Sequence, residues 1–189
     1  MKDRVIFLDT ETTGLDTDNC GVYQIAGLID IDGKTVEEIN IFTDIFQDDV
    51  IEEGVYELHG EERIKEIATY QRPLRAHAEL CKALGKYVDR YDPTDKLIAI
   101  AYVADFDNRV LRRFFKKNKD DYFGNYFWHP FICVMNLAAY MYQDKRHLFE
   151  NFKLGTVAHH LGIDIGGRPL HDGMVDVCLT REIYYKLTT

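Results

Sequence analysis

The sequence predicts an α/β fold in which helices cover both faces of a mixed β-sheet. Three observations support this: the apolar run Val5 to Leu8, strand-like segments on either side of Asp32-Gly33, and helical periodicity from Gly60 onward. Strands and helices in this order favour a layered α/β architecture. The chain of 189 residues, 46% hydrophobic and 29% charged, is long enough for one packed domain and short for two. We therefore expect a single core.

Three strands are predicted in the first quarter of the chain. Val5 to Leu8 is short, β-branched and aromatic, which is typical of a central strand covered on both faces. An Asp-Gly pair between alternating apolar segments is a strong hairpin signal, so Asp32-Gly33 joins the next two strands. Together these segments indicate three neighbouring strands. Residues 96–107 are predicted to form a further buried strand.

Helices are predicted over much of the remaining chain. Pro73 is expected to open a helix at its first turn, and Asp92-Pro93 is expected to end it. The other predicted helices cover 108–118 and about 133–142, 154–161 and 172–187, with Gly162 as the C-terminal cap of the 154–161 helix.

Composition restricts the classes of protein and ligand. A net charge of -9 disfavours tight wrapping of a long polyanionic duplex, since affinity for nucleic acid depends heavily on lysine and arginine. The objection is weaker if some carboxylates hold metal ions. No apolar run is long enough to span a bilayer and the charged start MKDR does not resemble a signal peptide, so we expect a soluble, cytoplasmic protein with no membrane partner. The four cysteines are widely spaced and are expected to be buried free thiols.

Two further segments allow more than one interpretation. The 108–118 helix has a basic face, which we expect to be a solvated surface that balances an acidic protein, with a phosphate track as the alternative. The aromatic run at 122–128 is expected to pack in the core or form a flexible lid, although such side chains also stack on unpaired bases.

Two carboxylates follow the first predicted strand. Residues two apart in a strand face the same side, so Asp9 and Glu11 present their carboxylates together if the strand extends that far. Like charges so close together need a counter-charge, and a hard divalent cation such as Mg²⁺ prefers oxygen ligands. The alternative is a solvated loop in which Thr12, Thr13 and Gly14 form an ordinary turn.

Three more polar residues each have an ordinary structural explanation when taken singly. Asp107 lies between a buried strand and an amphipathic helix, where aspartate is a common N-cap. His171 precedes the last predicted helix, where a histidine is usually a surface or capping residue, and Asp176 falls within the second turn of that helix.

Taken together, these residues resemble a known family. The motifs DxETTG at 9–14, FD at 106–107 and HxxxxD at 171–176 resemble, in order and spacing, those of the DEDDh group of DnaQ-like 3'-5' exonucleases, including DNA polymerase III epsilon-subunit-type domains. YQIAG after the first motif, LHG at 58–60 and FKLGTVAHHLGI before the third extend the resemblance across most of the chain. It implies one exonuclease domain over residues 1–189 with a ribonuclease H-like, three-layer α/β/α fold around a mixed five-stranded sheet.

The resemblance also implies roles for individual residues. Asp9, Glu11, Asp107 and Asp176 would coordinate two Mg²⁺ or Mn²⁺ ions, and His171 would be the general base. Two such ions can stabilise the attacking and leaving oxygens of an in-line phosphoryl displacement, and an imidazole can accept the proton of a water near neutral pH.

The family implies a substrate as well. The 3'-terminal nucleotide of single-stranded DNA or RNA would lie near Thr12, Thr13, Gly14 and Leu15, where backbone NH groups could bind its sugar or phosphate. Each turnover would release a nucleoside 5'-monophosphate. A polymerase partner is a further expectation from the family.

The sequence departs from the family pattern at several positions. The polar pair that commonly precedes the second motif is replaced by Tyr102 and Val103, Gln24 stands where glutamate is frequent, and Asp105 adds an acid next to the site. Asp105 would either repel a phosphate or pair with a basic residue. The altered pair supports an alternative function, a nuclease-like module that binds nucleic acid or a polymerase without catalysis. Hydrolysis of small phosphodiesters is a third option.

Overall fold

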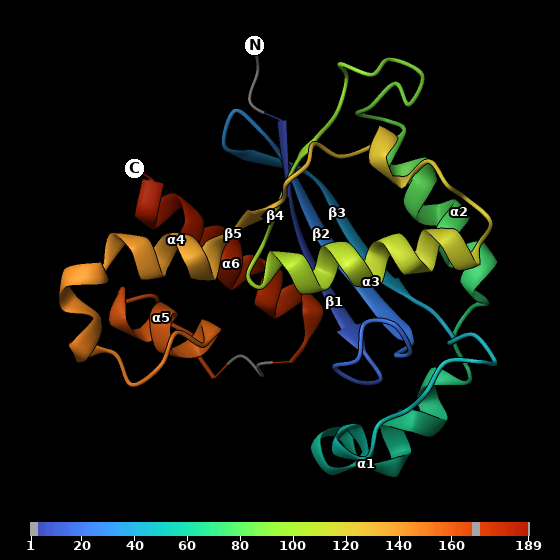
Figure 1. Ribbon diagram of the computed structural model, residues 1–189, viewed down its shortest axis with the longest axis horizontal. Coiled ribbons are helices and arrows are strands. Elements are labelled where there is room, and N and C mark those ends of the chain that lie inside the picture. The colour runs from blue at the N-terminus through green and yellow to red at the C-terminus, as the bar shows by residue number, and fades with distance from the viewer. Residues whose placement is uncertain (1–3, 168–170, 189) are drawn as a thin grey trace.

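A mixed sheet with helices on both faces forms the centre of the molecule (Figure 1). The computed structural model describes residues 4–167 and 171–188, except for the side chains of residues 58 and 59, which belong to the LHG segment. The strands of the described chain are β1 (Arg4–Thr12), β2 (Val22–Ile31), β3 (Lys34–Phe42), β4 (Ile98–Ala101) and β5 (Ile132–Cys133). Its α-helices are α1 (Glu53–Ile67), α2 (Pro73–Leu84), α3 (Ala104–Lys117), α4 (Val134–Met141), α5 (Leu154–His160) and α6 (Gly173–Thr188).

The strand order β3-β2-β1-β4-β5 places β1 at the centre of the five-stranded sheet. β1 pairs antiparallel with β2, β2 pairs antiparallel with β3, and β4 pairs parallel with β1 and with β5. Asp32 and Gly33 both have positive φ, as the hairpin between β2 and β3 requires. The predicted mixed sheet, its three neighbouring strands and this hairpin are therefore confirmed.

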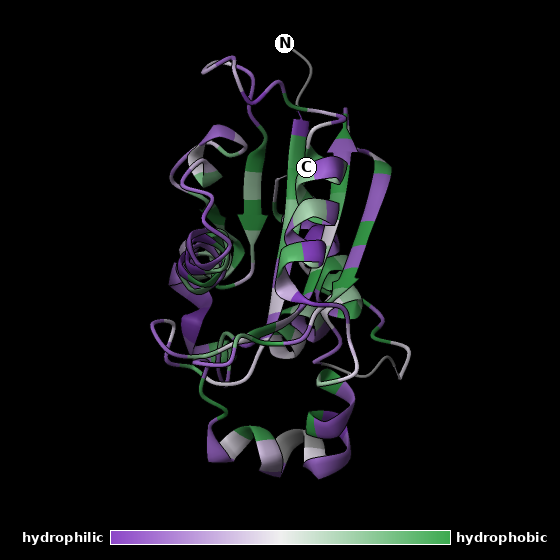
Figure 2. Ribbon diagram, turned by 90° about the vertical axis from the view of Figure 1, so that its right-hand side faces the viewer, coloured by the Kyte–Doolittle hydropathy of each residue, from purple (hydrophilic) through white to green (hydrophobic). Residues whose placement is uncertain are grey.

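Two apolar clusters fill the space between the sheet and its helices. Ile6 and Leu8 belong to a cluster that includes the apolar faces of α2 and α3, whereas Val5 and Phe7 belong to a cluster with α4, α5 and α6. Neighbouring residues of a strand point to opposite faces, so odd-numbered residues of β1 face α6 and even-numbered residues face α3. Figure 1 shows α3 in front of the strands, and Figure 2 shows α1 beyond the end of the sheet. This alternation decides which helix each polar residue at the end of β1 faces.

Four predicted boundaries were wrong. α2 ends at Leu84, well before Asp92, because Gly85 caps it and donates to Cys81 O, and the chain then continues through turns. β4 ends at Ala101, and α3 begins at Ala104 rather than at residue 108. The helical pattern expected from Gly60 begins earlier, at Glu53, and Gly60 itself is a kink with φ of 74° inside α1.

The C-terminal cap of α5 agrees with the prediction. Gly162 has φ of 67°, and its NH donates to His159 O while the NH of Ile163 donates to Ala158 O. This is the pattern of a left-handed glycine cap. Among residues 4–167 and 171–188, no helix is both long enough and apolar enough to cross a membrane.

Candidate active site

β1 carries Asp9 and Glu11 to the end of the sheet. The strand continues to Thr12, with Asp9 opposite Ala26 and Glu11 opposite Gln24 on β2, so the alternative of a solvated loop at this point was wrong. Both carboxylates face the α6 side of the sheet. One oxygen of each lies within 4.8 Å of the other and of a carboxylate oxygen of Asp176.

α3 provides a further carboxylate, from Asp107. Because α3 begins at Ala104, Asp107 is inside the first turn of the helix and is not its N-cap. Its side chain is buried, and its Oδ1 accepts a hydrogen bond of 2.8 Å from the Thr10 hydroxyl. An even-numbered residue of β1 therefore holds Asp107 beside the strand end.

The start of α6 carries Asp176 and is preceded by His171. Asp176 is buried, and its Oδ1 has no hydrogen-bond partner among the described residues. Its Oδ2 accepts a 3.4 Å contact from the backbone NH of His171. His171 has φ of 67°, a left-handed conformation that is uncommon for a residue with a side chain and often marks a functional site.

All five of these side chains line one cavity of about 200 Å³. Tyr102, Val103, Phe106 and Leu154 are among the residues that complete its wall. Asp107 is outside the set of three carboxylates with oxygens within 4.8 Å, but it lines the same cavity. We call this cavity, with Asp9, Glu11, Asp107, Asp176 and His171, the acid cleft.

The carboxylates of the acid cleft are held in an unfavourable electrostatic environment. Burial, followed by the charges of Asp107 and Glu11, raises the pKa of Asp9 well above its ordinary value. Burial, followed by the charge of Asp176, raises the pKa of Glu11 to about 7, and burial raises the pKa of Asp107 to about 7 despite the hydrogen bond from Thr10. The pKa of Asp176 is raised as well, chiefly by burial.

These properties fit a divalent cation. A cluster of carboxylates that repel one another, with a buried oxygen that no group in the described part of the chain satisfies, is stabilised by a positive charge placed among its oxygens. All the candidate ligands are hard oxygen donors, which suit Mg²⁺ or Mn²⁺.

A second cavity, of about 350 Å³, adjoins the acid cleft. Glu11, Phe106 and His171 line both cavities, and Thr12, Gly14 and Leu15 line the second one. Leu15 is 82% exposed, which is unusual for leucine and leaves an apolar surface at the mouth of the cavity. We call this second cavity the terminal pocket.

Thr13 does not belong to the terminal pocket, so its assignment as a substrate-binding residue needs correction. The residue is fully buried, and its hydroxyl donates to Val50 O at 2.6 Å and accepts from the NH of Gly21 at 2.7 Å. These bonds join the end of β1 to two other segments. Thr13 therefore has a structural role: it anchors the segment that follows β1 through buried hydrogen bonds.

The backbone NH groups of this loop are also engaged differently from expectation. The carboxylate of Glu52, at the start of α1, accepts hydrogen bonds of 2.9 Å from the NH groups of Leu15 and Asp16. A Cβ at Gly14 would lie 2.3 Å from this carboxylate, so glycine is required for the contact. The Leu15 NH is thus bound by Glu52 in this structure and is not open to a ligand.

Four supporting residues were missed by the sequence analysis. Thr10 and Glu52 bind residues far away in the sequence, for which no local pattern exists. Tyr23 on β2 donates to the Glu11 carboxylate at 3.4 Å. Phe106 was visible in the second motif, where its position beside Asp107 was the available signal.

The basic face of α3 mostly contacts acidic residues of nearby loops. Lys117 pairs with Asp48 and Asp49 at 2.5 and 2.6 Å, and Arg113 pairs with Asp49 at 2.8 Å. Arg109 is 3.7 Å from Asp18. These contacts agree with the expectation of a surface that balances an acidic protein.

The remaining open interpretations are decided by burial and contacts. Phe123, Tyr126 and Phe127 are buried in the core, which confirms core packing for the central part of the aromatic run. Asp105 is exposed, and none of the ion pairs formed among the described residues involves it. All four cysteines are free thiols, as expected, but only Cys20 is buried, and Cys81, Cys133 and Cys178 are partly exposed.

Comparison with known proteins agrees with this architecture. Residues 6–184 match the RNase T exonuclease family. The sequence has no significant match among curated proteins. Solved structures of exonuclease I are similar over 98–100% of this chain: one described in terms of processivity has 18% identity and a TM-score of 0.76, and E. coli exonuclease I in complex with a dT13 oligonucleotide has 18% identity and a TM-score of 0.75. A product-bound exonuclease I has 17% identity and a TM-score of 0.73.

The chain spans about two fifths of the length of these exonuclease I chains, at 40%, 41% and 44% of each. At such identities the likeness concerns the fold, and it confirms the expected mixed five-stranded sheet flanked by helices. The family match covers nearly the whole sequence and confirms the resemblance drawn from its motifs. The chain is therefore a member of the RNase T exonuclease family, within the DnaQ-like, ribonuclease H-like group of hydrolases.

Proposed function

We propose that this protein is a divalent-metal-dependent 3'-5' exonuclease that removes nucleotides from the 3' ends of single-stranded DNA or RNA. The observation that carries the proposal is the convergence of four carboxylates and one histidine, from three separate parts of the chain, on one cavity of about 200 Å³. Exonuclease family membership and the oligonucleotide-bound structure of E. coli exonuclease I support the reaction and the substrate class.

In this proposal Asp9, Glu11, Asp107 and Asp176 hold two Mg²⁺ or Mn²⁺ ions. When bound, such ions activate a water and stabilise the attacking and leaving oxygens of phosphodiester hydrolysis. The residues of β1 and the two helices fix the positions of the ligands, and Thr10 orients Asp107 through its hydroxyl. Rigid placement of charged ligands before the substrate arrives reduces the reorganisation needed during reaction.

His171 is proposed as the general base. It lines the acid cleft and the terminal pocket, so its imidazole can reach a water between the carboxylates and a bound phosphodiester. The imidazole would take the proton of that water, and the leaving 3' oxygen of the penultimate nucleotide would depart on the other side of the phosphorus. The products are a nucleoside 5'-monophosphate and a strand shortened by one residue.

The terminal pocket is proposed to hold the 3'-terminal nucleotide. Phe106 and the exposed Leu15 offer apolar surfaces for the base, and Thr12 and Gly14 line the same pocket. Stacking of a base on an aromatic side chain is tolerant of sequence, so no strong preference for the terminal base is expected. Binding of a free 3' end in this pocket would give the reaction its 3'-5' polarity.

The proposal is tested by digestion of single-stranded oligonucleotides labelled at the 5' end. With Mg²⁺ we expect a ladder of products shortened one nucleotide at a time and release of 5'-monophosphates. EDTA or Asp9→Asn should abolish the ladder, whereas Glu38→Gln, an exposed acid on edge strand β3, should not. Matched DNA and RNA oligomers of several lengths would define the sugar preference.

Two results would contradict the proposal. Digestion that survives EDTA or Asp9→Asn would show that the acid cleft does not carry the reaction. Binding of oligonucleotides without release of mononucleotides under Mg²⁺ or Mn²⁺ would identify the chain as a non-catalytic binding module.

A further inference from the structure

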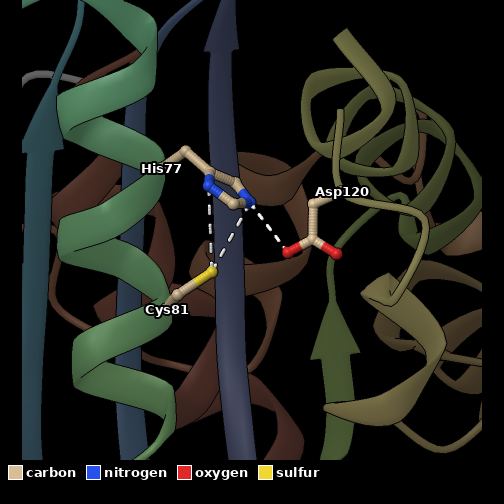
Figure 3. Close-up of side chains that lie close together, drawn as sticks. All are labelled: His77, Cys81 and Asp120. Atoms are coloured by element: carbon tan, nitrogen blue, oxygen red, sulfur yellow. Dashed lines mark hydrogen bonds and ion pairs between the residues drawn. The ribbon is translucent and has the colours of Figure 1, made fainter. Parts of the chain in front are cut away.

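A second group of metal-ligand side chains lies between α2 and the segment that follows α3. It consists of His77, Cys81 and Asp120, whose ligand atoms all lie within 4.8 Å of one another (Figure 3). His77 and Cys81 are four residues apart on α2, so they share one face of the helix. We call this group the His-Cys-Asp cluster.

The end of α3 holds Asp120 in place. Lys119 has φ of 60°, and the NH of Asp120 then donates to Phe115 O at 3.0 Å, which is a left-handed helix-ending motif. The same backbone turn directs the Asp120 side chain toward α2, where its Oδ2 is 3.2 Å from His77 Nε2. The position of the carboxylate is therefore set by backbone geometry.

The distances within the cluster match those of tetrahedral zinc ligands. His77 Nε2 is 3.2 Å from Asp120 Oδ2 and 3.5 Å from Cys81 Sγ. With metal bonds of about 2.0 Å to nitrogen and oxygen and about 2.3 Å to sulfur, ligands at tetrahedral angles are roughly 3.3–3.6 Å apart. The carboxylate oxygen thus already lies at nearly the separation from Nε2 that a shared ion would impose, whereas Sγ, which is also 4.0 Å from Nδ1, must turn from beside the ring toward the Nε2 lone pair to bind the same ion.

A thiol-imidazole-carboxylate catalytic triad does not explain this arrangement. In such a triad the nucleophile and the carboxylate contact opposite nitrogens of the imidazole. Here the carboxylate contacts Nε2 at 3.2 Å, whereas the sulfur lies beside the ring, 3.5 Å from Nε2 and 4.0 Å from Nδ1. One ring NH cannot serve both partners, whereas one cation beside the Nε2 lone pair can, once the Cys81 side chain turns toward it.

The surroundings suit a partly enclosed ion. Burial lowers the pKa of His77, which favours the neutral imidazole that binds metals. Burial raises the pKa of Cys81, and a bound ion would deprotonate this thiol. Cys81 also lines an open surface cavity of about 750 Å³ with Arg90 and Tyr126, which gives an ion a path to the cluster.

We propose that His77, Cys81 and Asp120 bind one Zn²⁺ ion, with water as the fourth ligand, and that the ion ties α2 to the end of α3. Nitrogen and thiolate ligands select zinc over magnesium, which prefers oxygen alone. The site is separate from the acid cleft: Asp107 lies in the first turn of α3, and Asp120 follows the end of this helix of 14 residues, which is about 20 Å long.

Co²⁺ titration of the metal-free, reduced full chain tests the proposal. Excess Mg²⁺ is present to fill the acid cleft, and the readout is the near-ultraviolet charge-transfer band of a thiolate-Co²⁺ bond, which an all-oxygen site cannot produce. We expect this band to saturate at one Co²⁺ per chain and to disappear when Zn²⁺ is added. Cys81→Ser should abolish the band, and Asp120→Asn should weaken Co²⁺ binding by at least about 10-fold.

Cys133→Ser is the matched control, because Cys133 lies on β5 away from the cluster and its thiol donates to Tyr102 O, as a serine hydroxyl can. This variant should keep the band. Circular dichroism of each variant establishes that it folds. If Cys81→Ser does not fold, the loss of Co²⁺ affinity in Asp120→Asn supplies the test instead. Absence of the band in the wild-type chain, or its persistence in Cys81→Ser, would overturn the proposal, and neither outcome depends on nuclease activity.

Discussion

The acid cleft and the His-Cys-Asp cluster lie toward opposite ends of α3 and differ in how their polar atoms are satisfied. In the cleft, four carboxylates repel one another, and Asp176 Oδ1 is buried without a hydrogen-bond partner among the described residues. In the cluster, the one carboxylate already contacts an imidazole nitrogen at 3.2 Å.

This difference shows two ways in which a fold presents a metal site. The carboxylates of the cleft repel one another, and a bound cation relieves this repulsion. The metal-free form of the cleft is therefore less stable than the metal-bound form. The cluster holds a single carboxylate that already contacts an imidazole, so a metal adds a crosslink between helices rather than relieving repulsion among like charges. Ligand type then divides the ions, since oxygen donors suit Mg²⁺ and nitrogen with sulfur suits Zn²⁺.

Removal of one cleft carboxylate is expected to have the largest effect. Asp107→Asn keeps the acceptor for the Thr10 hydroxyl but loses a charged ligand, so nuclease turnover should fall by about 1,000-fold, as for loss of a principal electrostatic contact. Steady-state digestion of a single-stranded oligonucleotide with Mg²⁺ measures this change. Asp105→Asn is the control, because Asp105 is an exposed acid in the same helical turn. Equal losses of turnover in both variants would show that the effect comes from the overall charge of α3 and not from a metal ligand.

A smaller loss is expected when the apolar wall between the two cavities is removed. Phe106→Ala should raise KM for oligonucleotides by roughly 10- to 100-fold, because stacking of a base on an aromatic ring contributes about 1–3 kcal/mol. The measurement is KM and kcat for a short single strand, with Phe106→Leu to separate stacking from apolar volume. If Phe106→Ala changed kcat alone, Phe106 would not contribute to substrate binding in the terminal pocket.

The pH dependence of stability should reveal the strain in the cleft. Glu11 and Asp107 have pKa values raised to about 7, so their contribution to the stability of the metal-free protein is present at low pH and lost as pH rises through about 7. Mg²⁺ should therefore raise Tm more at pH 8 than at pH 6, since binding requires the ionised forms.

Differential scanning fluorimetry at several pH values, with and without Mg²⁺, provides the comparison. The metal-free wild-type chain should lose stability relative to Asp107→Asn as pH rises from 5 to 8, on the order of a few kcal/mol. If the difference in stability between the wild-type chain and Asp107→Asn did not change with pH, the pKa of Asp107 would not be raised in the folded protein.

The Glu52 carboxylate accepts hydrogen bonds from backbone NH groups, so its removal should destabilise the fold, whereas removal of a cleft carboxylate should relieve repulsion. Glu52→Ala removes the acceptor of two NH groups and should lower the free energy of unfolding by about 1–2 kcal/mol. Gly14→Ala should cost a similar amount, because its Cβ would displace the same carboxylate. Urea unfolding measures both, and strongly additive effects in the double variant would show that the two changes act independently.

The smallest effect is expected from the cluster in the absence of metal. Asp120→Asn retains an oxygen that can accept from the His77 ring NH, so the unfolding free energy should change by about 1 kcal/mol or less. The same variant should reduce the stabilisation by Zn²⁺ that is expected for the wild-type chain. A large loss of stability without metal would mean that Asp120 is instead a charged structural partner of His77.

The sequence predicted those features of the fold that repeat locally or form a recognisable motif. The apolar run before Asp9, the Asp32-Gly33 hairpin and the spacing of the three motifs were sufficient for the sheet and the residues of the acid cleft. The end of α2 was missed because Val88 continues the apolar spacing even though Gly85 ends the helix. Apolar spacing alone does not distinguish a helix from a buried turn.

Contacts between distant segments could not be predicted in the same way. Glu52 reaches Leu15 across 37 residues, and Asp120 reaches α2 only because Lys119 adopts a left-handed conformation. The four-residue spacing of His77 and Cys81 was a usable signal for a shared helix face, but their third partner has no sequence relation to them. Motifs therefore identified the acid cleft, whereas only the fold reveals the His-Cys-Asp cluster.

The central place of β1 in the sheet has a consequence for inactivation by heat. Hydrogen-bonded ladders on both edges hold this strand, so its amide protons should be among the slowest in the chain to exchange with solvent. Fraying of α1, which lies beyond the end of the sheet, would leave Asp9 and Glu11 in register. The catalytic capacity of the protein should then persist during warming until the whole domain melts cooperatively.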